Sequence, residues 1–177
     1  MNLAVAKSFA PLTELLRLYS DADEIIFKNH GVLDKHTVAD LCRDARHLAR
    51  YLRLHHPRRS AGEIAQILAI QVSRDEWQVA EGRVVYLAEC RLRPPQISLN
   101  TSAISKLANR LRHWAGEGEQ VWFTEAQITE AAIAHELYHV LEQRPSRSAT
   151  ELAAHAFARE LIGLPFSPLL YSALSKQ

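Results

Sequence analysis

The chain has 177 residues, of which 47% are hydrophobic and 23% charged, so it is long and apolar enough to bury one sizeable core. Its formal net charge of +1 gives no general attraction to nucleic acid or to a membrane surface. No stretch reaches the roughly 18 apolar residues of a membrane span, and Glu14 and Arg17 interrupt any signal-peptide core. The two cysteines, Cys42 and Cys90, form no disulfide framework. We therefore expect a cytoplasmic protein.

The N-terminal part, residues 1–57, is predicted to be a helical region ahead of a main domain over residues 58–177. A first helix is expected from Leu12 to Tyr19, and a longer one from Thr37 to about His55. The longer helix has apolar residues at helical spacing, which predicts a buried stripe made of Leu41, Ala45, Leu48 and Leu52.

The same helix carries an arginine stripe. It consists of Arg43, Arg46, Arg50 and Arg53. Such a stripe could contact nucleic acid or an acidic partner, but it is more often a solvated helix face. The chain contains no recognisable DNA-binding helix-turn-helix. We therefore expect no direct binding of nucleic acid.

A helix and a hairpin are predicted next. A capping box at Ser60–Glu63 opens a short helix that ends near Ile70. Residues from Arg83 to Cys90 are rich in Val and Tyr and alternate as a strand does, and Gln96 to Asn100 forms the returning strand. The five residues Arg91 to Pro95 are expected to connect them as an antiparallel hairpin.

Three helices follow in the C-terminal half. The first is expected from Ser102 to Trp114, the second from Glu125 to Gln143 after the capping residue Thr124, and the third from Thr150 to Ile162. Residues 167–177 form a tail with at most one further helical turn. The predicted fold class is therefore α+β: a mostly helical domain with a small antiparallel sheet beside the second helix of these three.

That second helix contains H-E-L-Y-H at residues 135–139. Helical spacing places His135 and His139 on one face, one turn apart, where two imidazoles can bind one Zn²⁺. Glu136 lies beside them and can act as a general base toward water. The pattern therefore predicts metal-assisted hydrolysis. Zn²⁺ is the expected metal, although Mn²⁺, Fe²⁺ or Co²⁺ could occupy the same ligands.

The third ligand is expected to be Glu151, at the start of the next helix. An alternative role for Glu151 is to complete a capping box with Ser148. His155, one turn further along, could replace it as a ligand or support the ligands from behind. Glu142 shares the histidine face, but at 1.5 Å per residue it lies about 10 Å from His135, too far for one metal.

The segment that begins at Glu151 and ends at Pro165 resembles the E-x-x-A-x-x-F-A-x-x-L-L-x-P block of the ImmA/IrrE metallo-endopeptidases. Residues Ala134–His139 are similar to the A-H-E-L-G-H helix of that family, and Gln96–Asn100 to its I-x-L-N strand. The resemblance covers roughly residues 60–166. It implies a zincin-like domain and a gluzincin-type site with His135, His139 and Glu151 as ligands and Glu136 as catalytic base.

The resemblance also implies a cytoplasmic peptidase that cleaves a specific protein, often a helix-turn-helix repressor, in stress or mobile-element control. Tyr138 stands where the family usually has Gly, and it could narrow the cleft or bring a hydroxyl near the metal. Tyr138 and His155 are the nearest candidates in sequence for an oxyanion donor or a second-shell contact.

Two other functions remain open from the residues alone. Polypeptide deformylases also combine H-E-x-x-H with a cysteine from an upstream strand, and Cys90 ends such a strand here. Their E-G-C-L-S motif and their Gly-Leu-rich N-terminal motif are absent. The other possibility is a non-catalytic metal-binding interaction protein, in which His155 completes a closed set of four ligands.

Overall fold

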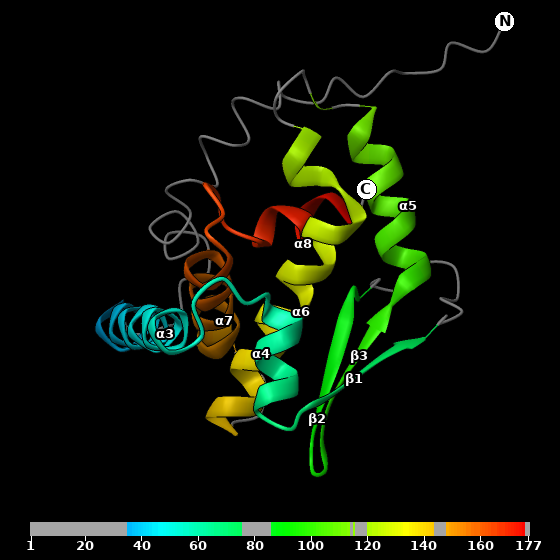
Figure 1. Ribbon diagram of the computed structural model, residues 1–177. Coiled ribbons are helices and arrows are strands. Elements are labelled where there is room, and N and C mark those ends of the chain that lie inside the picture. The colour runs from blue at the N-terminus through cyan, green and yellow to red at the C-terminus, as the bar shows by residue number, and fades with distance from the viewer. Residues whose placement is uncertain (1–34, 76–85, 114, 116–119, 144–147, 176–177) are drawn as a thin grey trace, which may run out of the picture.

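The structure is a computed structural model that describes residues 35–75, 86–113, 115, 120–143 and 148–175. The helix expected from Leu12 to Tyr19 lies outside these residues. The fold is α+β and mostly helical, as predicted, with one small sheet (Figure 1). Its helices are α3 (Lys35–His55), α4 (Ala61–Ile67), α5 (Thr101–Arg112), α6 (Glu125–Glu142), α7 (Ser148–Ile162) and α8 (Leu169–Ser175), with a 3-10 turn at Gln120–Phe123.

Helix α6 lies at the centre of the molecule. The sheet packs on one side of it, α7 packs on the other, and α3 packs against the far side of α7 (Figure 1). Helix α4 also contacts α6, and α5 follows directly from the last strand. The segment with H-E-L-Y-H is therefore held between a sheet and a second helix.

The sheet has three strands, β1 (Gln71–Asp75), β2 (Ala88–Leu92) and β3 (Pro95–Asn100), in the order β1-β3-β2. Strands β2 and β3 form the predicted antiparallel hairpin. The predicted five-residue connection is wrong, because the ladder continues to the pair Leu92↔Pro95 and leaves only residues 93–94 in the turn. Strand β1 was not predicted. It pairs parallel with β3, so the sheet is mixed rather than antiparallel.

Side-chain caps fix where the central helices begin. The Ser60 hydroxyl accepts from the backbone N–H of Glu63, whose carboxylate accepts from the backbone N–H of Ser60, so the predicted capping box is confirmed. The hydroxyl of Thr124 accepts from the backbone N–H of Gln127 at the start of α6. The other end of α6 closes at Gln143, whose φ of 50° lies in the left-handed region. The predicted bounds of this helix are therefore confirmed.

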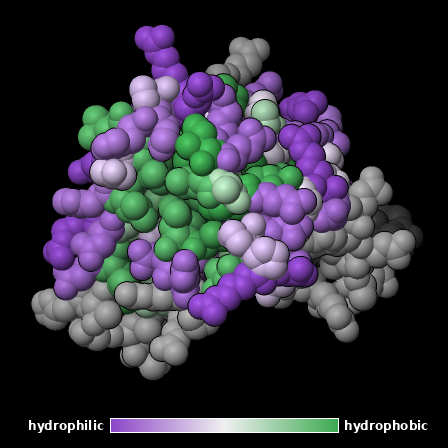
Figure 2. Space-filling view, turned by 60° about the horizontal axis from the view of Figure 1, so that its bottom comes forward, coloured by the Kyte–Doolittle hydropathy of each residue, from purple (hydrophilic) through white to green (hydrophobic). Residues whose placement is uncertain are grey.

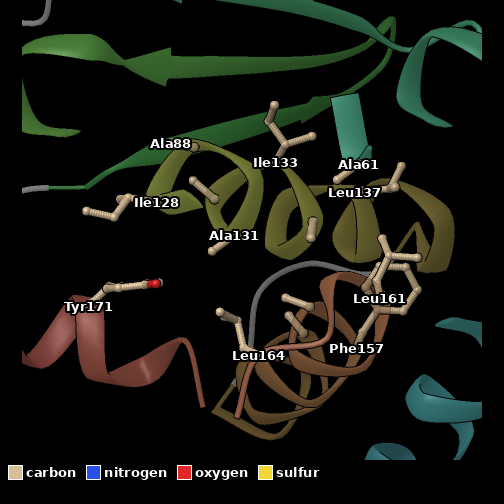
Figure 3. Packing of buried hydrophobic residues seen from close by; sticks show 14 of the residues in the cluster. Ala61, Ala88, Ile128, Ala131, Ile133, Leu137, Phe157, Leu161, Leu164 and Tyr171 are labelled. Atoms are coloured by element: carbon tan, nitrogen blue, oxygen red, sulfur yellow. The ribbon is translucent and has the colours of Figure 1, made fainter. Parts of the chain in front are cut away.

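The main core surrounds α6 (Figure 3). Ile128, Ala131 and Leu137 of α6 are buried, and Phe157 and Leu161 of α7 pack in the same cluster. The predicted stripe of α3 is also turned inward. Its residues Ala45 and Leu52 are buried in this cluster, and Leu41 and Leu48 pack against its border.

A second, small core joins α3 to α7. It consists of Val38, Cys42, Leu152 and Ala156. Beside it the guanidinium of Arg50 donates to the carboxylate of Glu160 at 3.0 Å, and Arg53 donates to the backbone carbonyl of Glu160 at 3.0 Å. Two members of the arginine stripe thus contact the protein's own α7. Arg43, in turn, pairs with Asp40 at 2.8 Å.

On one face of the molecule, hydrophobic side chains form a continuous area bordered by polar ones (Figure 2). Apolar areas of this kind are common where proteins bind other molecules. Within the described residues, no helix combines the length and the apolar character that crossing a membrane requires.

Candidate metal centre

Helices α6 and α7 bring three predicted ligands together. His135 and His139 lie one turn apart on α6, and their Nε2 atoms are 3.2 Å from each other. The carboxylate of Glu151, in the first turn of α7, lies 3.2 Å from Nε2 of His135 and 3.3 Å from Nε2 of His139. The Glu151 carboxylate therefore spans the two imidazoles, with Oε2 near His135 and Oε1 near His139.

The spacing of these donor atoms fits a zinc ion. Zinc binds His nitrogen and carboxylate oxygen at about 2.0–2.2 Å in tetrahedral geometry, which places neighbouring ligand atoms about 3.3 Å apart. The two Nε2 atoms are 3.2 Å apart, and each has one carboxylate oxygen of Glu151 at 3.2 or 3.3 Å. His135, His139 and Glu151 are also the only group of this kind among the described residues. The donor set therefore fits a divalent metal.

The site is buried on the histidine side and open on the carboxylate side. The side chains of His135 and His139 are 14% and 6% exposed, whereas that of Glu151 is 39% exposed. An opening of this kind gives water or a substrate access to the centre, as catalytic zinc sites require.

The position of Glu151 bears on its two predicted roles. Its carboxylate lies against the two histidines, and α7 already begins at Ser148, which places Ser148 inside the helix. Glu142, the predicted rival, lies outside the three-residue group. The geometry therefore favours a ligand role for Glu151.

The charges of the site affect its histidines. Burial disfavours the charged form of His135, but the hydrogen bond to Glu151 and the charges of Glu136 and Glu151 outweigh burial and raise its pKa. The pKa of His155 is lowered well below its usual value, mainly by burial and also by the neighbouring charge of His135. His155 therefore remains a neutral imidazole at neutral pH.

His155 packs directly against a ligand. Its ring centre lies 4.5 Å from that of His135, and it is not a member of the ligand group. The Nδ1 atoms of His135 and His155 are both buried and have no hydrogen-bond partner among the described residues. Buried polar atoms normally have partners, so these two nitrogens are the least satisfied part of the centre.

Tyr138 was considered as a residue that narrows the approach to the metal or brings a hydroxyl near it, but its side chain lies in the core. Its side chain is 2% exposed, belongs to the main core and packs against Phe157 with ring centres 5.4 Å apart. Residues 138 and 139 are separated by about 100° around the helix axis, so a side chain next to a ligand can point into the core. Tyr138 thus fills space between α6 and α7, and its side chain is shielded from solvent.

Cys90 of β2 is half-buried and is not part of the metal-ligand group. Burial raises the pKa of its thiol to about 12, and the charge of Glu136 acts in the same direction. The sequence suggested Cys90 only as a possible ligand. The influence of Glu136 on it was missed, because it depends on how the sheet packs on α6.

Comparisons of this chain with protein-family models, with curated proteins and with solved structures found no match. The resemblance to the ImmA/IrrE metallo-endopeptidases therefore rests on the short motifs alone.

Proposed function

We propose that the protein is a zinc-dependent endopeptidase of the ImmA/IrrE type. The observation that carries this proposal is the gathering of donor atoms from His135, His139 and Glu151, with Glu136 next to His135 in the sequence. A divalent metal held by these ligands would polarise a peptide carbonyl and make nearby water more acidic.

The residues of the chain then have separate tasks. Glu136 takes the proton of the attacking water and delivers it to the leaving amine, which is general base and then general acid catalysis. Its position directly after His135 on α6 keeps it next to the ligand residues. The open side next to Glu151 admits the substrate.

The sheet offers a place to hold an extended peptide. Strand β3 is central, so of the two hairpin strands only β2 has an edge that no other described strand pairs with. Strand β2 packs against α6, the helix that carries the two histidines. A peptide paired with the free edge of β2 would therefore lie beside the metal centre, held by backbone hydrogen bonds.

The proposed substrate is a specific cytoplasmic protein, and a helix-turn-helix repressor is the leading candidate. This part of the proposal comes from the resemblance of the motifs around Glu136 and Glu151. No nucleic acid is required, since Arg50 and Arg53 of the arginine stripe contact α7.

One other function has an observation in its favour. The ring of His155 lies 4.5 Å from that of His135, so a shift of His155 could supply a fourth protein ligand. A closed site with four protein ligands is typical of structural zinc. The protein would then be a non-catalytic metal-binding module. A deformylase-type site is less well supported, because Cys90 lies outside the ligand group.

The test combines metal analysis with peptide hydrolysis. We expect about one zinc per chain in the wild type and in Glu136→Gln, with hydrolysis of a repressor or generic protein substrate only in the wild type. Glu125→Gln is the matched control, because Glu125 is an exposed residue in the first turn of the same helix. Zinc binding without hydrolysis would favour the non-catalytic module, and full activity in Glu136→Gln would exclude Glu136 as the base.

A further inference from the structure

The outward side of α3 carries large apolar side chains that the core does not use. Tyr51 is 55% exposed and Leu54 is 78% exposed, and their spacing of three residues makes them neighbours on the helix surface. The opposite side of α3 is buried, with Cys42 in the small core and Leu52 in the main core. Single exposed apolar side chains are common on protein surfaces, whereas adjacent ones form patches that mark interaction sites.

The ring of Tyr51 is held by a neighbour on the same helix. The ring centre of His55 lies 4.0 Å from that of Tyr51, and Nδ1 of His55 lies 2.9 Å from the backbone carbonyl oxygen of Tyr51. These contacts restrict the rotation of an exposed aromatic side chain. A side chain that is ordered before binding loses less conformational freedom when a partner covers it, so Tyr51 is suited to anchor a partner.

The chain around these two side chains is strongly basic. Residues 46–59 contain five arginines and no acidic residue. The whole chain has a formal net charge of +1, so all other residues together carry −4. Glu160 pairs with Arg50 and Glu63 pairs with Arg59, and a positive excess remains at this surface. Complementary charge then favours a partner with acidic side chains.

The types of side chain favour a protein partner over a nucleic acid or a membrane. Arg and Tyr are enriched in protein–protein interfaces and Lys is depleted, and residues 46–59 contain no Lys. A protein bound along duplex DNA commonly contacts about 6–10 phosphates, whereas Arg50 and Arg53 already donate to Glu160. A membrane-bound helix inserts its broad apolar face into the lipid, but that face of α3 is buried inside the protein.

We propose that the outward side of α3 binds an acidic segment of another protein, whose apolar side chains cover Tyr51 and Leu54 while its carboxylates contact the surrounding arginines. We call this area the α3 docking surface. It consists of His47, Arg50, Tyr51, Leu54, His55 and Arg58, all of them exposed. Helix α7 lies between α3 and the helix that carries the metal-site histidines (Figure 1). The α3 docking surface is therefore separate from the metal centre and does not depend on the proposed peptidase function.

The test begins with a library of short random peptides displayed on phage, selected against the intact chain. We expect the enriched peptides to combine Asp or Glu with large apolar residues. One of them is then synthesised with a fluorescent label, and anisotropy gives its affinity for the wild type and for variants. Leu54→Ser and Tyr51→Ser should each weaken binding about tenfold or more, because a few central side chains carry most of the affinity of an interface.

Ile67→Ser is the matched control for these variants. Ile67 is also a large exposed apolar residue, 52% exposed, but it belongs to α4. Its replacement should leave the affinity for the peptide unchanged. All three side chains are exposed, so the variants are expected to fold. Equal affinity in wild type, Leu54→Ser and Tyr51→Ser overturns the proposal.

Arg58→Glu tests the charge of the α3 docking surface. It should weaken binding of the selected peptide several-fold, mainly through slower association, and the difference should shrink as salt is added. Arg112→Glu is the control, because Arg112 is an exposed arginine at the end of α5. An Arg58→Glu variant that binds the acidic peptide as tightly as the wild type contradicts the role of charge.

Other occupants of the α3 docking surface would give different results. A selection that enriches no peptides, or only peptides without acidic residues, overturns the proposal. Sedimentation at increasing concentration detects a second copy of the chain, and self-association that Leu54→Ser abolishes would assign the surface to a dimer instead. Duplex DNA or phosphatidylserine vesicles that bind the wild type more tightly than the peptide, and that Leu54→Ser fails to bind, would assign it to nucleic acid or to a membrane.

Discussion

The carboxylate of Glu151 lies 3.3 Å from Nε2 of His139, although the two residues belong to different helices. The contact exists because the first turn of α7 packs beside the last two turns of α6. A metal at this point would join the two helices, so metal binding and helix packing are expected to depend on each other.

Replacement of Glu151 by Ala tests this dependence. In the wild type, zinc at about 100 times its dissociation constant should stabilise the fold by about 2.7 kcal/mol. In Glu151→Ala the zinc-dependent shift should largely disappear, because one of three ligands is gone. Thermal unfolding with and without zinc measures the difference. Glu142→Gln is the control, since Glu142 lies outside the ligand group, and an equal zinc shift in Glu151→Ala would exclude Glu151 as a ligand.

We expect His155 to support the predicted metal ligand His135 as a neighbouring residue that does not itself bind the metal. The unpartnered Nδ1 of His135 needs an acceptor when Nε2 binds metal, and the ring of His155 is the neighbour 4.5 Å away. Loss of such a supporting contact commonly weakens metal binding about 10- to 100-fold. We expect His155→Ala to keep the stoichiometry of one zinc per chain with weaker affinity. Competition with a chelator gives the affinity, and a structural four-ligand site would instead lose its zinc outright.

Glu130 gives a pH dependence outside the metal centre. Its carboxylate accepts from the backbone N–H of Ala61 at 2.6 Å and also from that of Gly62, at the start of α4. Burial is the largest influence on its pKa and raises it above the ordinary 4.5, although these hydrogen bonds act in the opposite direction. A carboxyl group with a higher pKa in the folded state binds protons more tightly when folded.

The contribution of Glu130 to the free energy of unfolding is therefore greatest below pH 4.5 and is lost as the pH rises through the folded-state pKa. Glu130→Gln cannot titrate. Relative to the wild type, its free energy of unfolding should increase between pH 4 and pH 7, superimposed on a constant cost for the lost acceptor. Urea unfolding at several pH values measures this slope, and parallel pH profiles would contradict the raised pKa.

The attachment of α3 to α7 should depend on apolar packing more than on charge. Leu152 is 9% exposed in the small core between these helices, and truncation of a buried Leu usually costs about 2–5 kcal/mol. The Arg50–Glu160 pair is largely exposed on the arginine side, and such pairs contribute about 0–1 kcal/mol. Leu152→Ala should therefore increase hydrogen exchange throughout α3, whereas Glu160→Gln should change it little. A larger increase of hydrogen exchange in Glu160→Gln than in Leu152→Ala would show that the charge pair contributes more to the attachment of α3.

The sequence predicts the helices of the C-terminal half and the helical spacing of His135 and His139, because both depend on local spacing. Thr124 and Ser60 mark helix starts by short-range hydrogen bonds, and the spacing of His135 and His139 follows from the helical repeat. The approach of Glu151 could be anticipated from its place at the start of the next helix.

The rest could not be predicted, since it depends on tertiary packing. Strand β1 is short and polar and forms only through its parallel pairing with β3, so it has no signal of its own in the sequence. The burial of Tyr138 and the influence of the Glu136 charge on Cys90 arise from how α7 and the sheet pack on α6. The strand register could not be predicted either. Residues 91–95 look like a loop in the sequence, but the ladder extends to the pair Leu92↔Pro95 and leaves a shorter turn.

Glu151 and Leu152 are consecutive in α7, yet they serve different neighbours: Glu151 meets the histidines of α6, and Leu152 meets α3. Successive side chains on a helix are separated by about 100° around its axis, so both contacts are set by one rotational position of α7. A molecule that displaced α3 would allow α7 to rotate about its own axis. A small rotation would move the Glu151 carboxylate away from the two imidazoles. Removal of α3 is therefore expected to change the position of the Glu151 carboxylate relative to the two histidines.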